Sequence, residues 1–300
     1  MKVFVTGATG VLGNFAVKAL LADGHEVIGL ARCDENARAL AAAGVTPASA
    51  HLFDVHGLTS AIDGCNAVCN LATHVPVGMT ALRPGAWRVN DRLRTEGSKA
   101  VAAAATAAGV RRLVQESVSF MYADGGEEWI SEDGPLSVTR AVEPAAVAEA
   151  NAASFECRSR QPVVLRFGQF VGDDPTTRWT LGRAKAGHPV GLGAAASWGH
   201  VVHPEDAGAA VAAALEAPGG VYNVGAAPVR RGEMMQVIAQ AVERDDVGFV
   251  PPLLVKLAGE RVEPLTRSHR VSSAKLHEAT GWKPIREVFD QSWLTAAATR

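Results

Sequence analysis

The chain has 300 residues, of which 48% are hydrophobic and 20% charged, and its formal net charge is −2. This composition is typical of a folded globular protein with a substantial core, and it excludes an intrinsically disordered chain. The nearly balanced charge also argues against a broad basic surface, so we expect no nucleic-acid partner.

The N-terminal residues MKVFVTGATG run directly into an apolar segment and a glycine turn. They lack the apolar core and small-residue cleavage site of a signal peptide. The longest apolar runs are well short of the roughly 20 residues that cross a bilayer. Four cysteines fit a reducing compartment. We therefore expect a cytoplasmic protein with no membrane partner.

Short apolar runs alternate with helical stretches in the first half of the chain. The expected strands are 2–5, 25–30, 51–54, 67–71, one starting at 112–114, and 162–167. The expected helices are 11–22, a stretch ending at Gly44, 58–62, 87–108 and most of 135–156. This order predicts parallel strands joined by crossover helices, which is the α/β doubly wound parallel sheet of a Rossmann fold.

The pattern loosens after Gly172, with more glycine and proline and shorter helices. We therefore predict a dinucleotide-binding domain over 1–172 and a smaller C-terminal substrate lobe within 173–300. A segment near 200–225 is expected to return to the main sheet, with 221–224 as its strand.

A glycine-rich turn lies between the first expected strand and helix. Gly7, Gly10 and Gly13 of TGATGVLG recur at spacings of three. The first allows a tight turn, the second lets a diphosphate approach the backbone, and the third lets helix and strand pack closely. Free N–H groups at the helix N-terminus would bind the diphosphate. The expected cofactor-binding residues here are Thr6, Gly7, Thr9, Gly10, Val11, Leu12 and Gly13.

The end of the second expected strand bears on which dinucleotide is bound. An acidic residue there would bind the 2′-hydroxyl of NAD. The chain instead has Ala31-Arg32, with no carboxylate before Asp34. Arg32 could contact the 2′-phosphate of NADP, although a solvent-facing arginine is the simpler alternative. The sequence favours NADP over NAD.

Further segments follow the glycine turn in order: Asp54-Val55, Asn70-Leu71-Ala72-Thr73, Asn90, LRFG at 165–168, HVVHPED at 200–206 and GWKP at 281–284. Together they resemble the extended and atypical short-chain dehydrogenase/reductase superfamily, in its NAD-dependent epimerase/dehydratase-like branch. The resemblance implies that Asp54 and Val55 contact adenine. It also implies cofactor contacts for Leu71, Ala72, Thr73 and Asn90, and a nicotinamide-supporting strand at 165–168.

The same resemblance implies a catalytic serine or threonine, a tyrosine, and a lysine four residues after it, followed by a glutamate. If Glu149 is that glutamate, the tyrosine and lysine positions are Ala141 and Ala145. The only two tyrosines, Tyr122 and Tyr222, have glycine and alanine four residues further on. No Tyr-x-x-x-Lys motif occurs in the chain, so we predict that the usual proton relay is absent.

The serine position is also altered. The resemblance places it at Val118, which has a serine on each side. Neighbouring strand residues point to opposite faces, so Ser117 and Ser119 are expected to point away from the face of Val118.

Other donors near the expected cleft could replace the relay, and the candidates are Ser117, Ser119, Tyr122, His74 and His203. We retain Ser117, Tyr122 and His74 as catalytic candidates. A packing role for Tyr122 and a substrate-binding or idle role for His74 are the simpler alternatives.

His200, His203 and Asp206 recur at spacings of three, which is one pattern of metal ligands. Asp206 is, however, a suitable N-cap for a helix from Ala207. We therefore predict no metal site.

The sequence thus favours an NADP-dependent oxidoreductase or epimerase that acts on a small-molecule substrate with a non-standard proton donor. Two alternatives remain open: a non-redox isomerase, cyclase or lyase, and a nucleotide-sensing binding protein without turnover. The expected helix at 87–108 resembles one that the superfamily uses to form dimers, which leaves a homodimer open.

Overall fold

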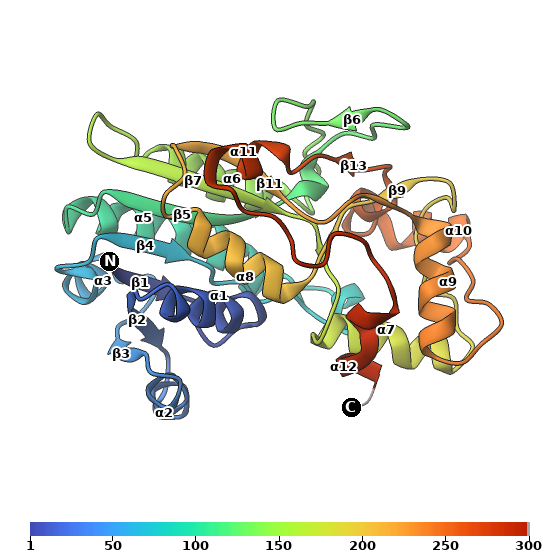
Figure 1. Cartoon of the computed structure of the whole chain (residues 1–300), viewed down its shortest axis with the longest axis horizontal. Helices are drawn as coiled ribbons and strands as arrows, with labels where there is room; N and C mark the ends of the chain where they lie inside the picture. Colours follow the sequence, from blue (N-terminus) through green and yellow to red (C-terminus); the bar gives the residue numbers. More distant parts are fainter. Residues whose placement is uncertain (299–300) are drawn as a thin grey trace.

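A seven-stranded parallel sheet forms the centre of the molecule. The computed structural model describes residues 1–298, and the strand order is β11-β7-β5-β4-β1-β2-β3 (Figure 1). The strands are β1 (Lys2–Thr6), β2 (Glu26–Ala31), β3 (Thr46–Ser49), β4 (Ala67–Asn70), β5 (Arg112–Val118), β7 (Gln161–Phe167) and β11 (Gly220–Val224). The predicted doubly wound sheet is confirmed. The strand order reverses between β1 and β4, which is where such sheets bind ligands.

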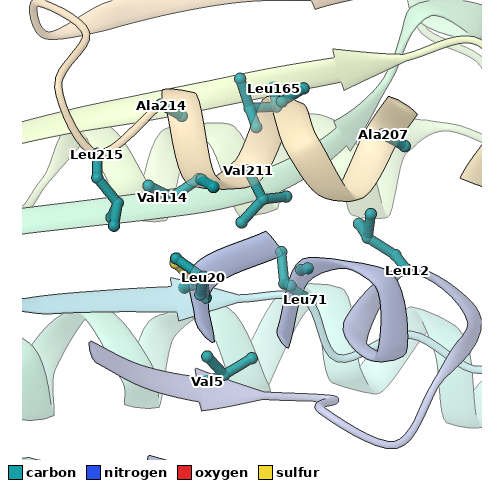
Figure 2. Close-up of a cluster of buried hydrophobic side chains, with 14 of the residues drawn as sticks. Val5, Leu12, Leu20, Leu71, Val114, Leu165, Ala207, Val211, Ala214 and Leu215 are labelled. Carbon is teal, nitrogen blue, oxygen red and sulfur yellow. The ribbon is translucent and has the colours of Figure 1, made fainter. Parts of the chain in front are cut away.

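Helices cover both faces of this sheet. One face carries α1 (Val11–Ala22), α2 (Asp34–Ala42), α8 (Pro204–Ala213) and α11 (Ala274–Thr280); the other carries α3 (Val55–Ile62), α5 (Ser98–Ala107) and α6 (Glu143–Ala153). Figure 2 shows part of the first core, where Leu20 of α1 and Val211 of α8 lie near Val114 of the sheet. Burial on both faces explains why the central strands are almost continuously apolar.

The helix expected at 87–108 is present with an irregular middle. It consists of α4 (Arg88–Arg92), a π-helical turn (Leu93–Gly97) and α5. Arg94 of the π turn donates from Nη2 to the buried Glu116 carboxylate of β5 at 2.6 Å. The π turn therefore carries a buried ion pair that joins this helix to the sheet.

The third strand was predicted at the wrong place. It lies at 46–49 rather than 51–54, and it is an edge strand with three of its four residues exposed. Such a strand has no apolar run to mark it. Residues 51–53 instead form a turn before α3, and Asp54 caps α3 by accepting the His56 N–H at 3.1 Å.

The helix expected over most of 135–156 is shorter than predicted. α6 starts at Glu143, with Pro144 in its first turn, and residues 135–142 form an irregular segment. Backbone bonds such as Ser137 N–H to the Met121 carbonyl hold this segment against the end of β5. Ala145 and Ala148 are buried, so α6 is not a plain surface helix.

A second lobe contains α7 (Pro175–Lys185), α9 (Arg231–Ala241), α10 (Pro252–Ala258) and α12 (Thr295–Ala298), grouped on the right in Figure 1. Short paired strands complete the fold: β6 (Trp129–Ile130) with β13 (Arg270–Val271), β8 (Gln169–Phe170) with β10 (Val201–Val202), and β9 (Trp198–Gly199) with β12 (Val229–Arg230). The 3-10 turns are Gly78–Leu82, Ser119–Met121, Gly259–Arg261, Glu263–Thr266 and Gln291–Leu294.

The second half of the chain contributes to both lobes. The expected return of 221–224 is confirmed, because β11 pairs with β7 in parallel. The sequence did not predict that Leu276 of α11 and Trp282 also enter the main core. Part of the C-terminal region therefore closes the main sheet as well as building the second lobe.

Candidate functional site

The glycine turn has no room for side chains at two positions. Gly7 has a φ of +67°, and a Cβ there would lie 2.6 Å from the Leu71 carbonyl oxygen. A Cβ at Gly13 would lie 2.0 Å from the Gly7 carbonyl oxygen. No side chain caps α1, whose N-cap is the exposed Gly10. The turn and the helix N-terminus therefore form a cradle that fits a dinucleotide diphosphate.

A buried polar network supports this cradle. Thr6 Oγ1 donates to Asn70 Oδ1 at 2.6 Å, and Asn70 Nδ2 donates to Gln115 Oε1 at 2.8 Å. The Leu71 N–H donates to Thr6 Oγ1 at 3.2 Å. These bonds join the carboxyl ends of β1 and β4 to the middle of β5, beside the point where the strand order reverses. Asn70 and Gln115 were not among the predicted site residues, although Asn70 is a polar residue at the end of an apolar strand and Gln115 is a buried polar residue within β5.

The loop after β4 continues from this network. Leu71 is buried, Ala72 is partly buried, and Thr73 and His74 are exposed. Asn90 of α4 is 4% exposed, and its Oδ1 accepts the His74 N–H at 3.1 Å. Asn90 thus anchors the loop, while its expected contact with the cofactor stays a prediction.

The residues expected to bind the adenosine end are exposed. Arg32 follows β2 directly, and no hydrogen bond or ion pair engages its side chain within residues 1–298. Val55 is 41% exposed at the start of α3. Arg32 and Val55 are thus accessible to a ligand, as is the Asp54 side chain, which also caps the helix.

Ser117 is fully buried and committed to structure. Its hydroxyl donates to Glu149 Oε1 at 2.6 Å. The same carboxylate accepts two bonds from Arg166, at 2.8 Å from Nε and 2.7 Å from Nη2. The predicted catalytic role of Ser117 is therefore not favoured, because the strand turns its side chain toward α6.

Tyr122 is also fully buried, and both hydrogen-bonding functions of its hydroxyl are used. The hydroxyl donates to Asn223 Oδ1 at 2.8 Å and accepts from Arg166 Nη1 at 3.0 Å. Burial raises the Tyr122 pKa, and Arg166 partly opposes this rise. The structure favours the packing role over the predicted catalytic one.

Ser119 takes part in a different contact. Its Oγ lies 2.9 Å from Nδ1 of His200, and both residues are buried. Burial lowers the His200 pKa to about 3, so the ring is neutral. Its Nε2 has no hydrogen-bond partner among residues 1–298 and faces Gly225, where a Cβ would lie 1.9 Å away. This contact links the end of β5 to the β9–β10 region.

The positions that the resemblance assigns to the catalytic serine, tyrosine and lysine converge in space. Val118, Ala141 and Ala145 belong to one apolar cluster, which also contains Met121 and Val142. The convergence agrees with the expected correspondence between these positions and the relay. Methyl and isopropyl groups occupy all three, so they offer no group that could transfer a proton.

A pocket of about 530 Å³ opens beside the β4 loop. It is lined by His74, Val75, Pro76, Val77, Thr80, Arg83, Pro84, Gly85 and Ala86. Its volume is in the range of small-molecule sites. Of the three predicted catalytic residues, only His74 is exposed, and it lines this pocket.

The residues considered as metal ligands have other roles. Asp206 lies inside α8 and accepts the Ile285 and Arg286 N–H groups at 2.9 and 3.2 Å. The N-cap of α8 is His203, not Asp206 as predicted, since the helix begins at Pro204. Within residues 1–298 no three His, Cys, Asp or Glu side chains are grouped as a metal site. No helix of this region is long and apolar enough to span a membrane.

A doubly wound sheet with a glycine cradle at its switch point defines a dinucleotide-binding Rossmann protein. Comparison with known proteins agrees: residues 7–218 match the family model described as NAD(P)H-binding. The chain is 32% identical over 304 residues to the 3-diazoavenalumate denitrifying reductase of a Streptomyces species, covering 95% of this chain and 96% of the relative. The chain belongs to the NAD(P)H-binding family of the extended short-chain dehydrogenase/reductase superfamily.

Solved structures show the same fold. The Thermus thermophilus UDP-glucose 4-epimerase in complex with NAD has a TM-score of 0.75 at 24% identity, covering 100% of this chain and 98% of the epimerase. A nucleoside-diphosphate-sugar epimerase from Pseudomonas aeruginosa has a TM-score of 0.81 at 18% identity, covering 100% and 96%. The predicted superfamily resemblance is confirmed, whereas the choice between NADP and NAD stays a prediction.

Proposed function

We propose that this protein is an NADPH-dependent reductase whose substrate needs no proton from an enzyme tyrosine. The observation that carries the proposal is the apolar cluster of Val118, Ala141 and Ala145, which lies where the superfamily's proton relay is expected. The glycine cradle at the end of β1 is intact. The chain thus combines the means to hold a hydride donor with an apolar replacement of the relay.

This combination restricts the chemistry. Reduction of a ketone places negative charge on oxygen, and loss of the general acid costs roughly 10²- to 10⁴-fold in rate. A diazonium carbon has no such requirement: it accepts the hydride pair as a new C–H bond, while the C–N pair leaves with N₂. Charge and atoms balance without an added proton. The Streptomyces relative is named as a denitrifying reductase of a diazo compound, which supports a diazo substrate here.

The cofactor, when bound, supplies the hydride. The chain's own residues provide binding and shielding. The α1 N-terminus holds the diphosphate, and Arg32 holds the 2′-phosphate of NADPH with a charge-assisted contact. The apolar cluster keeps water from the reacting carbon, which limits hydrolysis of a reactive diazo group.

The cofactor assignment is tested by titrating the protein with NADPH and NADH and following nucleotide fluorescence. We expect NADPH to bind tighter by roughly tenfold or more, and Arg32→Ala to remove this difference by deleting one charged contact. Arg111→Ala, an exposed arginine outside the site, is the control and should bind like wild type. Equal affinities in wild type would reject the NADP preference, and no binding of either nucleotide would reject the reductase.

The reaction is tested by supplying a stable quinone diazide and measuring both NADPH consumption and N₂ release. We expect one N₂ for each NADPH consumed and slow or no turnover of a matched ketone. NADPH consumption with the ketone alone would indicate an ordinary oxidoreductase. Turnover at the same rate with oxidised and reduced cofactor would indicate an isomerase, cyclase or lyase. Tight NADPH binding without turnover would leave a nucleotide sensor.

A further inference from the structure

The loop at residues 74–86, which lines the pocket after β4, is anchored by contacts with its neighbours. Asn90 fixes its start through the His74 N–H. Trp87 Nε1 donates to the Ala81 carbonyl at 2.9 Å and closes its end. Trp179 of α7 packs on Gly78, where a Cβ would lie 2.4 Å from the indole nitrogen. The loop that lines the pocket is therefore anchored at both ends and packs against α7.

The charges around the pocket have one sign. Among its lining residues, Arg83 is the only permanently charged side chain, and no carboxylate lines the pocket. Arg83 is exposed, and within the described part of the chain no hydrogen bond or ion pair engages its guanidinium. A guanidinium at a pocket wall is suited to two parallel hydrogen bonds with a carboxylate. The pocket thus fits an anion with one negative group.

Several other lining residues have apolar side chains. Val75, Pro76, Val77, Pro84 and Ala86 supply hydrocarbon surface. The same loop exposes Met79 by 59% and Leu82 by 49%.

The segment after α10 meets this loop. Arg261 Nη2 lies 3.1 Å from Asp91 Oδ2, and its guanidinium carbon is 5.5 Å from the centre of the Trp87 ring. Directly before it, α10 exposes Leu253, Leu254 and Leu257 by 69%, 54% and 75%.

We infer that this pocket binds an apolar organic carboxylate, with Arg83 holding the carboxylate and His74 lying on the same wall. The inference rests on the proposed function in taking this pocket as the substrate site. It adds the chemical class of the substrate, which is a single carboxylate on an apolar body. Arg83 is then a specificity-determining residue.

Calorimetric titration of the full chain, saturated with NADP⁺, tests the inference with three probes: cinnamate, the isosteric neutral cinnamamide, and UDP-glucose. We expect cinnamate to bind at least about tenfold tighter than cinnamamide, because only the carboxylate gains the charged contact. Arg83→Gln should remove this difference and leave cinnamamide binding unchanged. Arg88→Gln, a nearby exposed arginine that does not line the pocket, is the matched control and should behave like wild type.

Three results would overturn the inference: equal affinity for cinnamate and cinnamamide, no effect of Arg83→Gln, or tight binding of UDP-glucose with no binding of cinnamate at millimolar concentration. Because binding is measured without turnover, the two proposals can fail separately. Arg83-dependent binding without reduction of any diazo compound would reject the proposed reaction and keep the substrate class. Equal reduction of charged and neutral diazo compounds would reject the substrate class and keep the proposed reaction.

Discussion

At the residue scale, the glycine cradle depends on the absence of single methyl groups. A Cβ at Gly13 would lie 2.0 Å from a backbone oxygen, and neither the turn nor α1 can move without losing the cradle. Gly182 of α7 provides the contrast, because a Cβ there meets no atom of residues 1–298 within 4 Å. Substitutions at the two glycines therefore test whether Gly13 is required because the backbone of the turn lies so close to it, or only because glycine is flexible.

We predict that Gly13→Ala destabilises the fold by about 1–3 kcal/mol and abolishes NADPH binding, because the added methyl overlaps the turn. Gly182→Ala should be neutral or stabilise by roughly 0.5–1 kcal/mol, since alanine is the better helix former. Urea denaturation and NADPH titration of both variants provide the check. Normal NADPH binding by Gly13→Ala would contradict the assignment of the cradle.

Tyr122 poses a second question at this scale, namely whether its hydroxyl supports structure or catalysis. Tyr122→Phe leaves the buried Asn223 Oδ1 without its donor and removes one of the two acceptors of Arg166 Nη1. We expect a loss of about 1–3 kcal/mol in unfolding free energy, with reductase turnover per folded molecule unchanged. A large fall in kcat with full stability would instead restore Tyr122 as the proton donor.

At the element scale, a buried ion pair joins α6 to the sheet. The Arg166–Glu149 pair has side chains 6% and 14% exposed, and it also carries the hydrogen bonds of Ser117 and Tyr122. The resemblance associates Glu149 with the region of the missing relay. The structure shows that this carboxylate fastens α6 to the ends of β5 and β7, so it has a reason to be present without the relay.

We predict that Glu149→Gln costs about 3–5 kcal/mol, because it leaves the Arg166 charge buried and unpaired. Glu96→Gln breaks an exposed pair with Arg92, whose side chains are 53% and 61% exposed. That variant should change stability by less than about 1 kcal/mol. Chemical denaturation curves of the two variants give the comparison. Similar small losses in both would show that the Arg166–Glu149 ion pair contributes little to stability.

At the scale of the whole molecule, the interface between the sheet and the second lobe buries neutral histidines. Burial lowers the pKa of His200 to about 3 and that of His269 to about 4. In the unfolded chain both rings bind a proton near their usual pKa of about 6.5. Their contribution to stability is therefore complete above that value and is lost as the pH falls below it. Burial raises the pKa of Glu116 and Asp174. Their contribution to stability is therefore lost as the pH rises, which is opposite to the effect of the histidines.

The His200→Gln variant separates the effect of His200 on the pH dependence of stability from the effect of those carboxyl groups. We expect the stability difference between wild type and His200→Gln to shrink by about 2 kcal/mol between about pH 7 and pH 5, because only wild type must keep this ring unprotonated. Ser119→Ala removes the hydrogen bond but keeps the ring, so its stability profile should run parallel to wild type. Thermal or urea unfolding of the three proteins across this pH range measures these profiles. Parallel profiles for all three would contradict the conclusion that the buried His200 ring is neutral.

The sequence by itself determined the sheet, the glycine cradle and the lack of a Tyr-x-x-x-Lys motif, because these depend on local periodicity, on the small size of glycine and on counting. The placement of the edge strand β3 and the start of α6 needed the structure, since exposed or irregular segments leave no apolar pattern. Only the tertiary structure brought Val118, Ala141 and Ala145 into one cluster and joined Ser117 to Glu149. It alone paired Ser119 with His200, residues 81 apart in the chain. Contacts at that separation come from packing and lie beyond the reach of local patterns.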